Sequence, residues 1–258
     1  MKEVFCFVRA SLILAMLCLV SNAVAVNPGQ FTANEIIAKA VERTKNKHCE
    51  QDTYAFTKTT VREERDSQGQ VKERKHKSDQ IIFRNGDYFN TGRVDVSDPV
   101  EIEENDLAEL ENRKPNKRKD YLDLLTPELV GKYTFSLLSH TTANGRSVYE
   151  ISFQPRKKRL PASDLKERVM NQATGTLWID DSEFELVRAR IYLNSEISVG
   201  GFLGALKRAA FSLERVRLES GVWFERFYKT DYEARKLAQV KRVTTQSECG
   251  NFRRINNG

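Results

Sequence analysis

The sequence has few of the residues on which enzymes and metal sites depend. Three histidines and four cysteines occur among 258 residues. His48, His76 and His140 lack the spacing of metal ligands, and there is no Cys-x-x-Cys pair, so neither a metal nor a cofactor is predicted. Gly-x-Ser-x-Gly, a phosphate-binding loop and His-Glu-x-x-His are also missing. The sequence therefore indicates a protein that is not an enzyme.

Long hydrophobic runs are missing as well. One short apolar run, residues 11–20, ends in Ala23-Val24-Ala25, an Ala-x-Ala site for a secretory peptidase. This run is well short of the roughly 20 apolar residues that a spanning helix needs, although an uncleaved anchor is the alternative. We expect residues 1–25 to be a signal peptide removed after Ala25. Residues 26–258 are then one soluble, exported domain.

Cleavage would leave two cysteines, Cys49 and Cys249, in an oxidising compartment. When an exported chain has only two cysteines, they usually form a disulfide. The predicted Cys49–Cys249 bond would tie the end of the first helix to the C-terminal tail. It would contribute about 5 kcal/mol in the chain-entropy model. Two free thiols are the alternative.

Charged residues are plentiful, and the basic ones outnumber the acidic ones. Charged residues make up 30% of the chain, apolar residues 40%, and the net charge is +6, which is typical of a globular protein. Basic clusters occur at residues 72–77, 114–119 and 156–159. We do not expect nucleic acid as a partner, because aromatic residues alternate into strands and do not stand between the basic ones. An anionic membrane surface fits the clusters, and so does ordinary solvation.

Hydrophobic periodicity predicts a mainly β protein with a few helices. A Thr32/Glu35 capping box begins an amphipathic helix over residues 32–47. Acidic and then basic residues over 101–119 predict a solvated helix, followed by a short helix over 120–130. Alternating polarity predicts the strands, at about residues 53–63, 71–83, 88–89, 133–137, 148–154, 176–180, 186–193, 207–218, 222–232 and 236–245.

The hairpin of residues 174–193 also carries a family resemblance. Its strand Gly175-Thr-Leu-Trp-Ile-Asp180, the strand that follows, and the later Gly200-Gly201 turn resemble the periplasmic outer-membrane lipoprotein-sorting family, which includes LolA-like and LolB-like carriers and the N-terminal domain of RseB-like regulators. The resemblance implies a strongly curved antiparallel sheet or unclosed β-barrel. It also implies an N-terminal helix, and inserted helices that act as a lid over the concave face.

In that family an apolar hollow in the sheet holds acyl chains. Strand alternation places ten apolar side chains of this sequence on one face, namely Tyr133, Phe135, Leu137, Tyr149, Ile151, Phe153, Leu177, Ile179, Val187 and Ile191. The resemblance thus implies a periplasmic carrier of lipid acyl chains or lipoproteins, with these residues as the lining. A filled core is the alternative for the same face. An envelope signalling or scaffold protein that binds another protein is the alternative function.

Overall fold

The computed structural model describes residues 31–45, 53–93, 125–156, 162, 165–193, 195–199, 204–237 and 239–255. Several predictions therefore fall outside the described residues. They concern the signal peptide, the position of Cys49, the charged helix over 101–119 and the Gly200-Gly201 turn. The helix predicted over 120–130 is described only in part, with α-helix at Pro127–Val130. Residues 31–258 form one compact unit.

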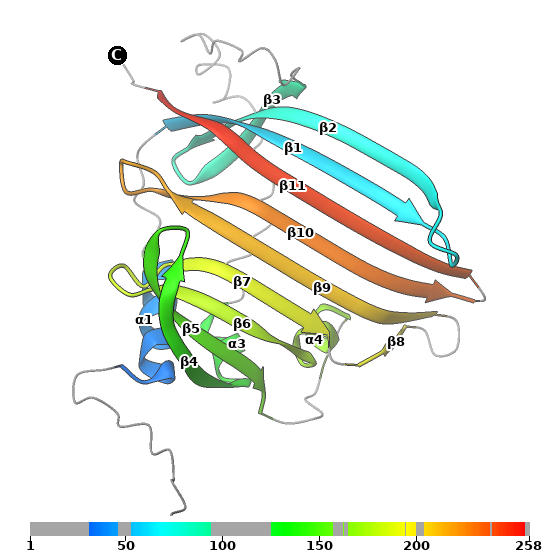
Figure 1. Cartoon of the computed structure of the whole chain (residues 1–258), viewed down its shortest axis with the longest axis horizontal. Coiled ribbons are helices and arrows are strands. Elements are labelled where there is room, and N and C mark those ends of the chain that lie inside the picture. The colour runs from blue at the N-terminus through cyan, green and yellow to red at the C-terminus, as the bar shows by residue number, and fades with distance from the viewer. Residues whose placement is uncertain are drawn as a thin grey trace, which may run out of the picture. The chain divides into compact units, whose positions relative to one another are not determined.

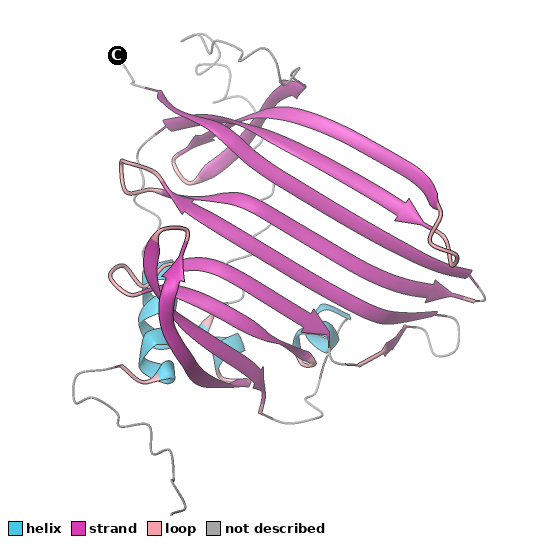
Figure 2. Cartoon of the chain, in the orientation of Figure 1, coloured by secondary structure: helices cyan, strands magenta, loops and turns pink. Residues whose placement is uncertain are grey.

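Strands dominate the structure, and most begin within a few residues of the predicted positions (Figures 1 and 2). In chain order they are β1 Thr53–Arg65, β2 Val71–Arg84, β3 Asp87–Arg93, β4 Tyr133–Ala143, β5 Arg146–Pro155, β6 Ala173–Asp180, β7 Leu186–Leu193, β8 Ile197–Val199, β9 Gly204–Arg217, β10 Trp223–Lys236 and β11 Gln239–Ile255. The helices are α1 Ala33–Lys45, α3 Pro127–Val130 and α4 Leu165–Met170.

All of these strands belong to one antiparallel sheet. Its order is β3-β2-β1-β11-β10-β9-β7-β6-β5-β4, with β8 paired to the start of β9. Over the described residues β3 and β4 end the sheet and do not pair with each other, so the sheet curves without closing (Figure 1). The predicted class, a curved antiparallel sheet that forms no closed barrel, is confirmed.

Helix α1 covers one face of the sheet behind β4–β7 (Figure 1). The predicted capping box is formed, with the Thr32 amide donating to Glu35 Oε2 at 2.8 Å and the Glu35 amide donating to Thr32 Oγ1 at 3.3 Å. Ile36 and Ile37 are completely buried against the sheet. Arg43 adds an ion pair to Glu185, 3.1 Å away, in the turn before β7. Apolar burial and one charge pair therefore fix α1 on the sheet.

A second, aromatic cluster lies under the other half of the sheet. Phe224 of β10 packs edge-on against Tyr54 and Phe56 of β1 and Phe83 of β2, with ring centroids 5.2 to 5.7 Å apart. Such edge-on contacts favour the ring quadrupoles and add to the area buried. The hydrophobic core of the long sheet is thus divided, and these two are its largest clusters.

Candidate ligand-binding site

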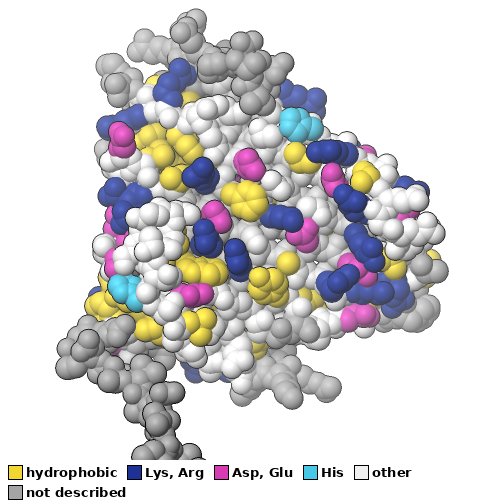
Figure 3. Space-filling model, viewed as in Figure 1, with side chains coloured by type: hydrophobic (Ala, Val, Ile, Leu, Met, Phe, Trp, Pro, Cys, Tyr) yellow, Lys and Arg dark blue, Asp and Glu magenta, His cyan; other side chains and the backbone are white. Residues whose placement is uncertain are grey.

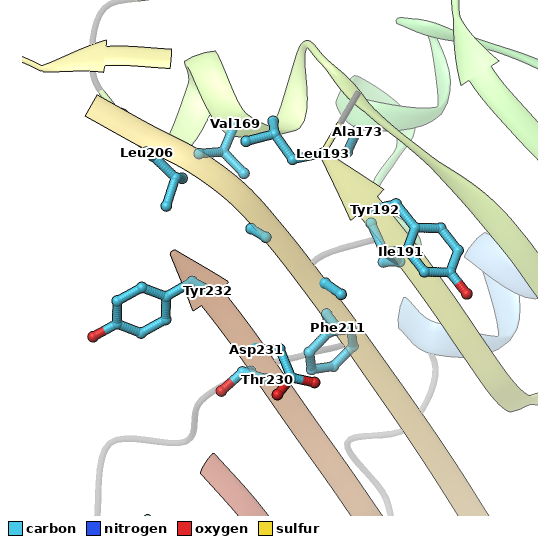
Figure 4. A pocket seen from close by; sticks show the side chains of 12 residues that line it. Val169, Ala173, Ile191, Tyr192, Leu193, Leu206, Phe211, Thr230, Asp231 and Tyr232 are labelled. Carbon is cyan, nitrogen blue, oxygen red and sulfur yellow. The ribbon is translucent and has the colours of Figure 1, made fainter. Parts of the chain in front are cut away.

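A hollow of about 390 Å³ lies beside the first cluster, between α4 and strands β7, β9 and β10 (Figure 4). Its wall is almost entirely apolar. Leu206, Ala209 and Phe211 of β9 line it. Val169 of α4 faces the space (Figure 4). The complete lining is Val169, Ala173, Ile191, Tyr192, Leu193, Leu206, Ala209, Ala210, Phe211, Thr230, Asp231 and Tyr232.

Asp231 is the only charged residue among those that line the hollow. Its carboxylate accepts a hydrogen bond from the Thr244 hydroxyl at 2.6 Å and lies 3.3 Å from Lys229 Nζ. This carboxylate is already engaged outside the apolar space. The hollow therefore suits a hydrocarbon ligand better than a polar one.

The structure brings together nine of the ten residues that the sequence predicted as a lining. Seven are buried in the cluster beneath α1, namely Tyr133, Tyr149, Ile151, Phe153, Leu177, Ile179 and Ile191, while Phe135 and Leu137 pack against its edge. Only Ile191 also borders the hollow. Helix α1 fills the space over most of the predicted face, so these side chains form packed core and the hollow lies alongside it.

Val187 does not share this face. Ile179 pairs with Leu186 and Trp178 with Arg188, which leaves Val187 as the extra residue of a β-bulge. Its side chain packs with Trp178 and Trp223 in a separate cluster. The placement of Val187 by simple alternation was therefore wrong, because the bulge shifts the register by one residue and Leu186 takes its position.

Most of the residues of the hollow that sequence reasoning missed lie on β9 and β10. The others are Val169 of α4, Ala173 of β6, and Tyr192 and Leu193 of β7. Alternation of Ala209, Phe211 and Leu213 was a usable signal for one face of β9. It is interrupted at Lys207, which is the extra residue where Glu233 pairs with Arg208 and Ala234 with Leu206. The small alanines also make this segment look less like a core strand than its neighbours. The contribution of α4 depends on a tertiary contact that no local pattern shows.

A charged cluster lies between the two hydrophobic clusters. Lys58 Nζ is 3.3 Å from Glu225 Oε1 and 4.9 Å from the ring centre of Tyr228. Burial alone would lower the pKa of Lys58, but the charge of Glu225 and the nearby Cys249 and Tyr228 outweigh burial and raise this pKa. Burial raises the pKa of the Cys249 thiol to about 12. A reduced Cys249 would thus be a protonated, unreactive thiol.

A polar cluster at the β4–β5 hairpin contains serine, histidine and aspartate without catalytic geometry. His140 Nε2 is 2.9 Å from Asp181 Oδ2 and also 2.9 Å from Ser147 Oγ. A nucleophile relay needs the carboxylate and the hydroxyl on opposite ring nitrogens, and here both meet the same one. Among the described residues no group of three histidine, cysteine or carboxylate side chains is placed to hold a metal ion.

No protein-family model matches the sequence, and no curated protein matches it. Solved structures do resemble it. An outer-membrane lipoprotein-sorting protein domain from Vibrio parahaemolyticus is 12% identical, with 86% of this chain and 93% of that chain covered and a TM-score of 0.37. A LolA superfamily protein from Nitrosomonas europaea is 13% identical, with 89% and 96% covered and a TM-score of 0.30.

The MucA/MucB complex from Pseudomonas aeruginosa is also similar, at 10% identity, with 87% of this chain and 99% of that chain covered and a TM-score of 0.28. Within the described part of the chain, no helix has the length and apolar character needed to cross a bilayer.

Proposed function

We propose that this protein is a non-enzymatic periplasmic carrier that binds a lipid acyl chain, free or attached to a lipoprotein, in the hollow between α4, β7, β9 and β10. One observation carries the proposal. A preformed space of about 390 Å³ with an apolar wall adjoins the packed core. Ligand pockets commonly measure about 300 to 1,000 Å³, so the hollow has the size of a ligand site.

The chemistry of the wall fits such a ligand. Each methylene moved from water into an apolar site contributes about 0.8 kcal/mol, so a single chain gives an affinity that is useful and still reversible. Reversibility is what a carrier needs. The residues around the hollow offer no paired acid and base, so they hold a ligand and do not transform it.

The test fills the hollow with a large side chain. We expect Ala209→Trp to abolish binding of a fluorescent fatty acid, because the indole would occupy the space next to Phe211. Ser212→Trp is the matched control, since it adds the same side chain to the same strand but Ser212 does not line the hollow. Both variants should remain folded by circular dichroism.

Equal binding by the Ala209→Trp variant and the wild type would rule out the hollow as the site. Failure of the wild type to bind any fatty acid would remove the carrier function. That second outcome would leave the scaffold alternative, in which the sheet binds another envelope protein.

A further inference from the structure

Positive charge gathers at one end of the long strands. This end consists of residues 62–75, 204–208, 233–237 and 239–243, which we call the basic rim. It holds eleven lysines and arginines against five acidic residues, a net charge of +6 that equals the net charge of the whole chain. The opposite ends of the same strands, together with β3, comprise residues 53–58, 79–93, 213–226 and 248–255. They hold eight basic residues against six acidic ones.

Strand register places the charges of the basic rim side by side. Arg65 of β1 pairs with Arg242 of β11, and Arg242 and Arg208 both reach Glu233 of β10, at 3.0 and 2.7 Å. Lys72 remains 60% exposed at the start of β2 and Arg208 75% exposed on β9. Figure 3 shows basic side chains concentrated on the right, where these strand ends lie in Figure 1. The five acidic residues of the rim, which include Asp66 at 3.2 Å from Lys72 Nζ, leave this surface with a net positive charge.

Large apolar side chains are exposed at the same end. Val71 at the start of β2 is 48% exposed, Val199 at the end of β8 is 39% exposed, and Leu237 after β10 is 57% exposed. Leu237 also has a φ of 55°, in the left-handed region where glycine or asparagine is easier to accommodate. A leucine that is both exposed and strained contributes little to stability. Such a residue suggests a role in binding.

We propose that the basic rim docks the protein on an anionic phospholipid surface, with Val71, Val199 and Leu237 entering the interface between head groups and acyl chains. Basic residues next to exposed apolar side chains are the combination that holds proteins on anionic membranes. Lys72 follows Val71 directly, and Lys236 precedes Leu237. Val71 and Leu237, at the two turns, therefore each have a lysine next to them in the chain.

The basic rim also adjoins the hollow. Leu206 lines the hollow and is followed by Lys207 of the rim, and Tyr232 precedes Glu233. Docking would bring the hollow close to the membrane from which, on the function proposed above, an acyl chain is taken or to which it is delivered. This last step rests on the proposed carrier function. The docking itself does not.

The test is flotation of the purified protein with vesicles of phosphatidylcholine, alone or mixed with phosphatidylglycerol. We expect binding to the mixed vesicles only, and weaker binding as salt is added. Lys72→Gln combined with Lys236→Gln should weaken binding by about fivefold for each lysine, roughly 25-fold together. The matched control is Arg93→Gln with Arg226→Gln, which removes the same charge from the opposite strand ends and should bind like the wild type.

A second variant separates docking from folding. Leu237→Asn should weaken vesicle binding by about fivefold or more while the unfolding midpoint stays equal or rises, because asparagine tolerates a positive φ. Leu138→Asn, at a 56% exposed leucine of β4, should leave vesicle binding unchanged.

Absence of binding to the mixed vesicles, or equal binding to both vesicle types, would overturn the proposal. Wild-type binding by the Leu237→Asn variant, together with competition by heparin, would assign the rim to a soluble polyanion instead. The Ala209→Trp variant should lose fatty-acid binding and still float with the vesicles. Failure of the carrier function can thus be told apart from failure of docking.

Discussion

Single residues decide how closely neighbouring strands approach, and Gly175 of β6 is the clearest case. A Cβ atom at this position would lie 2.0 Å from the carbonyl oxygen of Arg190 on β7. Because the obstacle is backbone, no side-chain rotation relieves it. This glycine is part of the strand motif by which the hairpin resembles the lipoprotein-sorting family, and its role here is steric.

We predict that Gly175→Ala lowers the free energy of unfolding by about 3 kcal/mol, because β6 and β7 must separate to admit the methyl group. Gly250→Ala on β11 is the control, since a Cβ there meets nothing within 4 Å. It should change stability by no more than about 0.5 kcal/mol. Urea denaturation of both variants measures the difference, and equal values would contradict this reading of Gly175.

The predicted Cys49–Cys249 disulfide stays a prediction. Cys249 is buried in β11 and pairs with Lys58 of β1, whereas Cys49 lies outside the described residues. A buried thiol with a pKa of about 12 resists alkylation even when it is free, so labelling of the native protein does not answer the question. Alkylation in denaturant without reductant does.

We expect neither Cys49 nor Cys249 to be modified under those conditions, and both to be modified after reduction. Mass spectrometry of the digested protein would show the cross-linked peptide pair. Alkylation of both cysteines before reduction would contradict the bond.

Alternation of residues along a single strand can also assign a side chain to the wrong face of the sheet. Alternation put Leu177, Ile179 and Ile191 on the correct face, because each strand keeps its period of two there. Val187 was misplaced because a β-bulge is set by how two strands pair and not by either strand's own pattern.

At the scale of elements, local sequence signals predicted where helices and strands begin better than where they end. The capping box located α1, and Asn85-Gly86 located the β2–β3 turn, where both residues have positive φ. Strand β11 was predicted to end at Thr245 but continues to Ile255. Residues 246–255 gain backbone partners on β1, which follows much earlier in the sequence. Pairing across such a distance is not encoded in the local pattern.

Packing of α1 predicts a difference between core and hollow. Ile151 of β5 is completely buried in the cluster beneath α1, so Ile151→Ala should lower the free energy of unfolding by about 3 kcal/mol. Phe211 of β9 is only partly buried and borders the hollow, so Phe211→Ala should cost clearly less, although it removes more atoms. Denaturant titration compares the two. A larger loss for Phe211→Ala would show that the hollow is packed in solution.

On the scale of the whole molecule, the open sheet has two regions that differ in packing. The β4–β7 half is closed by α1 and holds most of the apolar face that the sequence pointed to. The hollow and the basic rim lie at strand ends on the other side of β7. The predicted apolar ligand site stays a prediction, and of its ten residues only Ile191 borders the hollow. Nothing local in the sequence reveals which part of a long apolar face a helix will cover.

Native mass spectrometry of the protein purified from an envelope fraction tests the central claim most directly. We predict that the wild type carries additional mass matching one acyl lipid or lipoprotein chain, that the Ser212→Trp variant carries it too, and that the Ala209→Trp variant does not. A wild-type protein with no bound lipid, or the same lipid on all three proteins, would contradict the account of the hollow as an acyl-chain site.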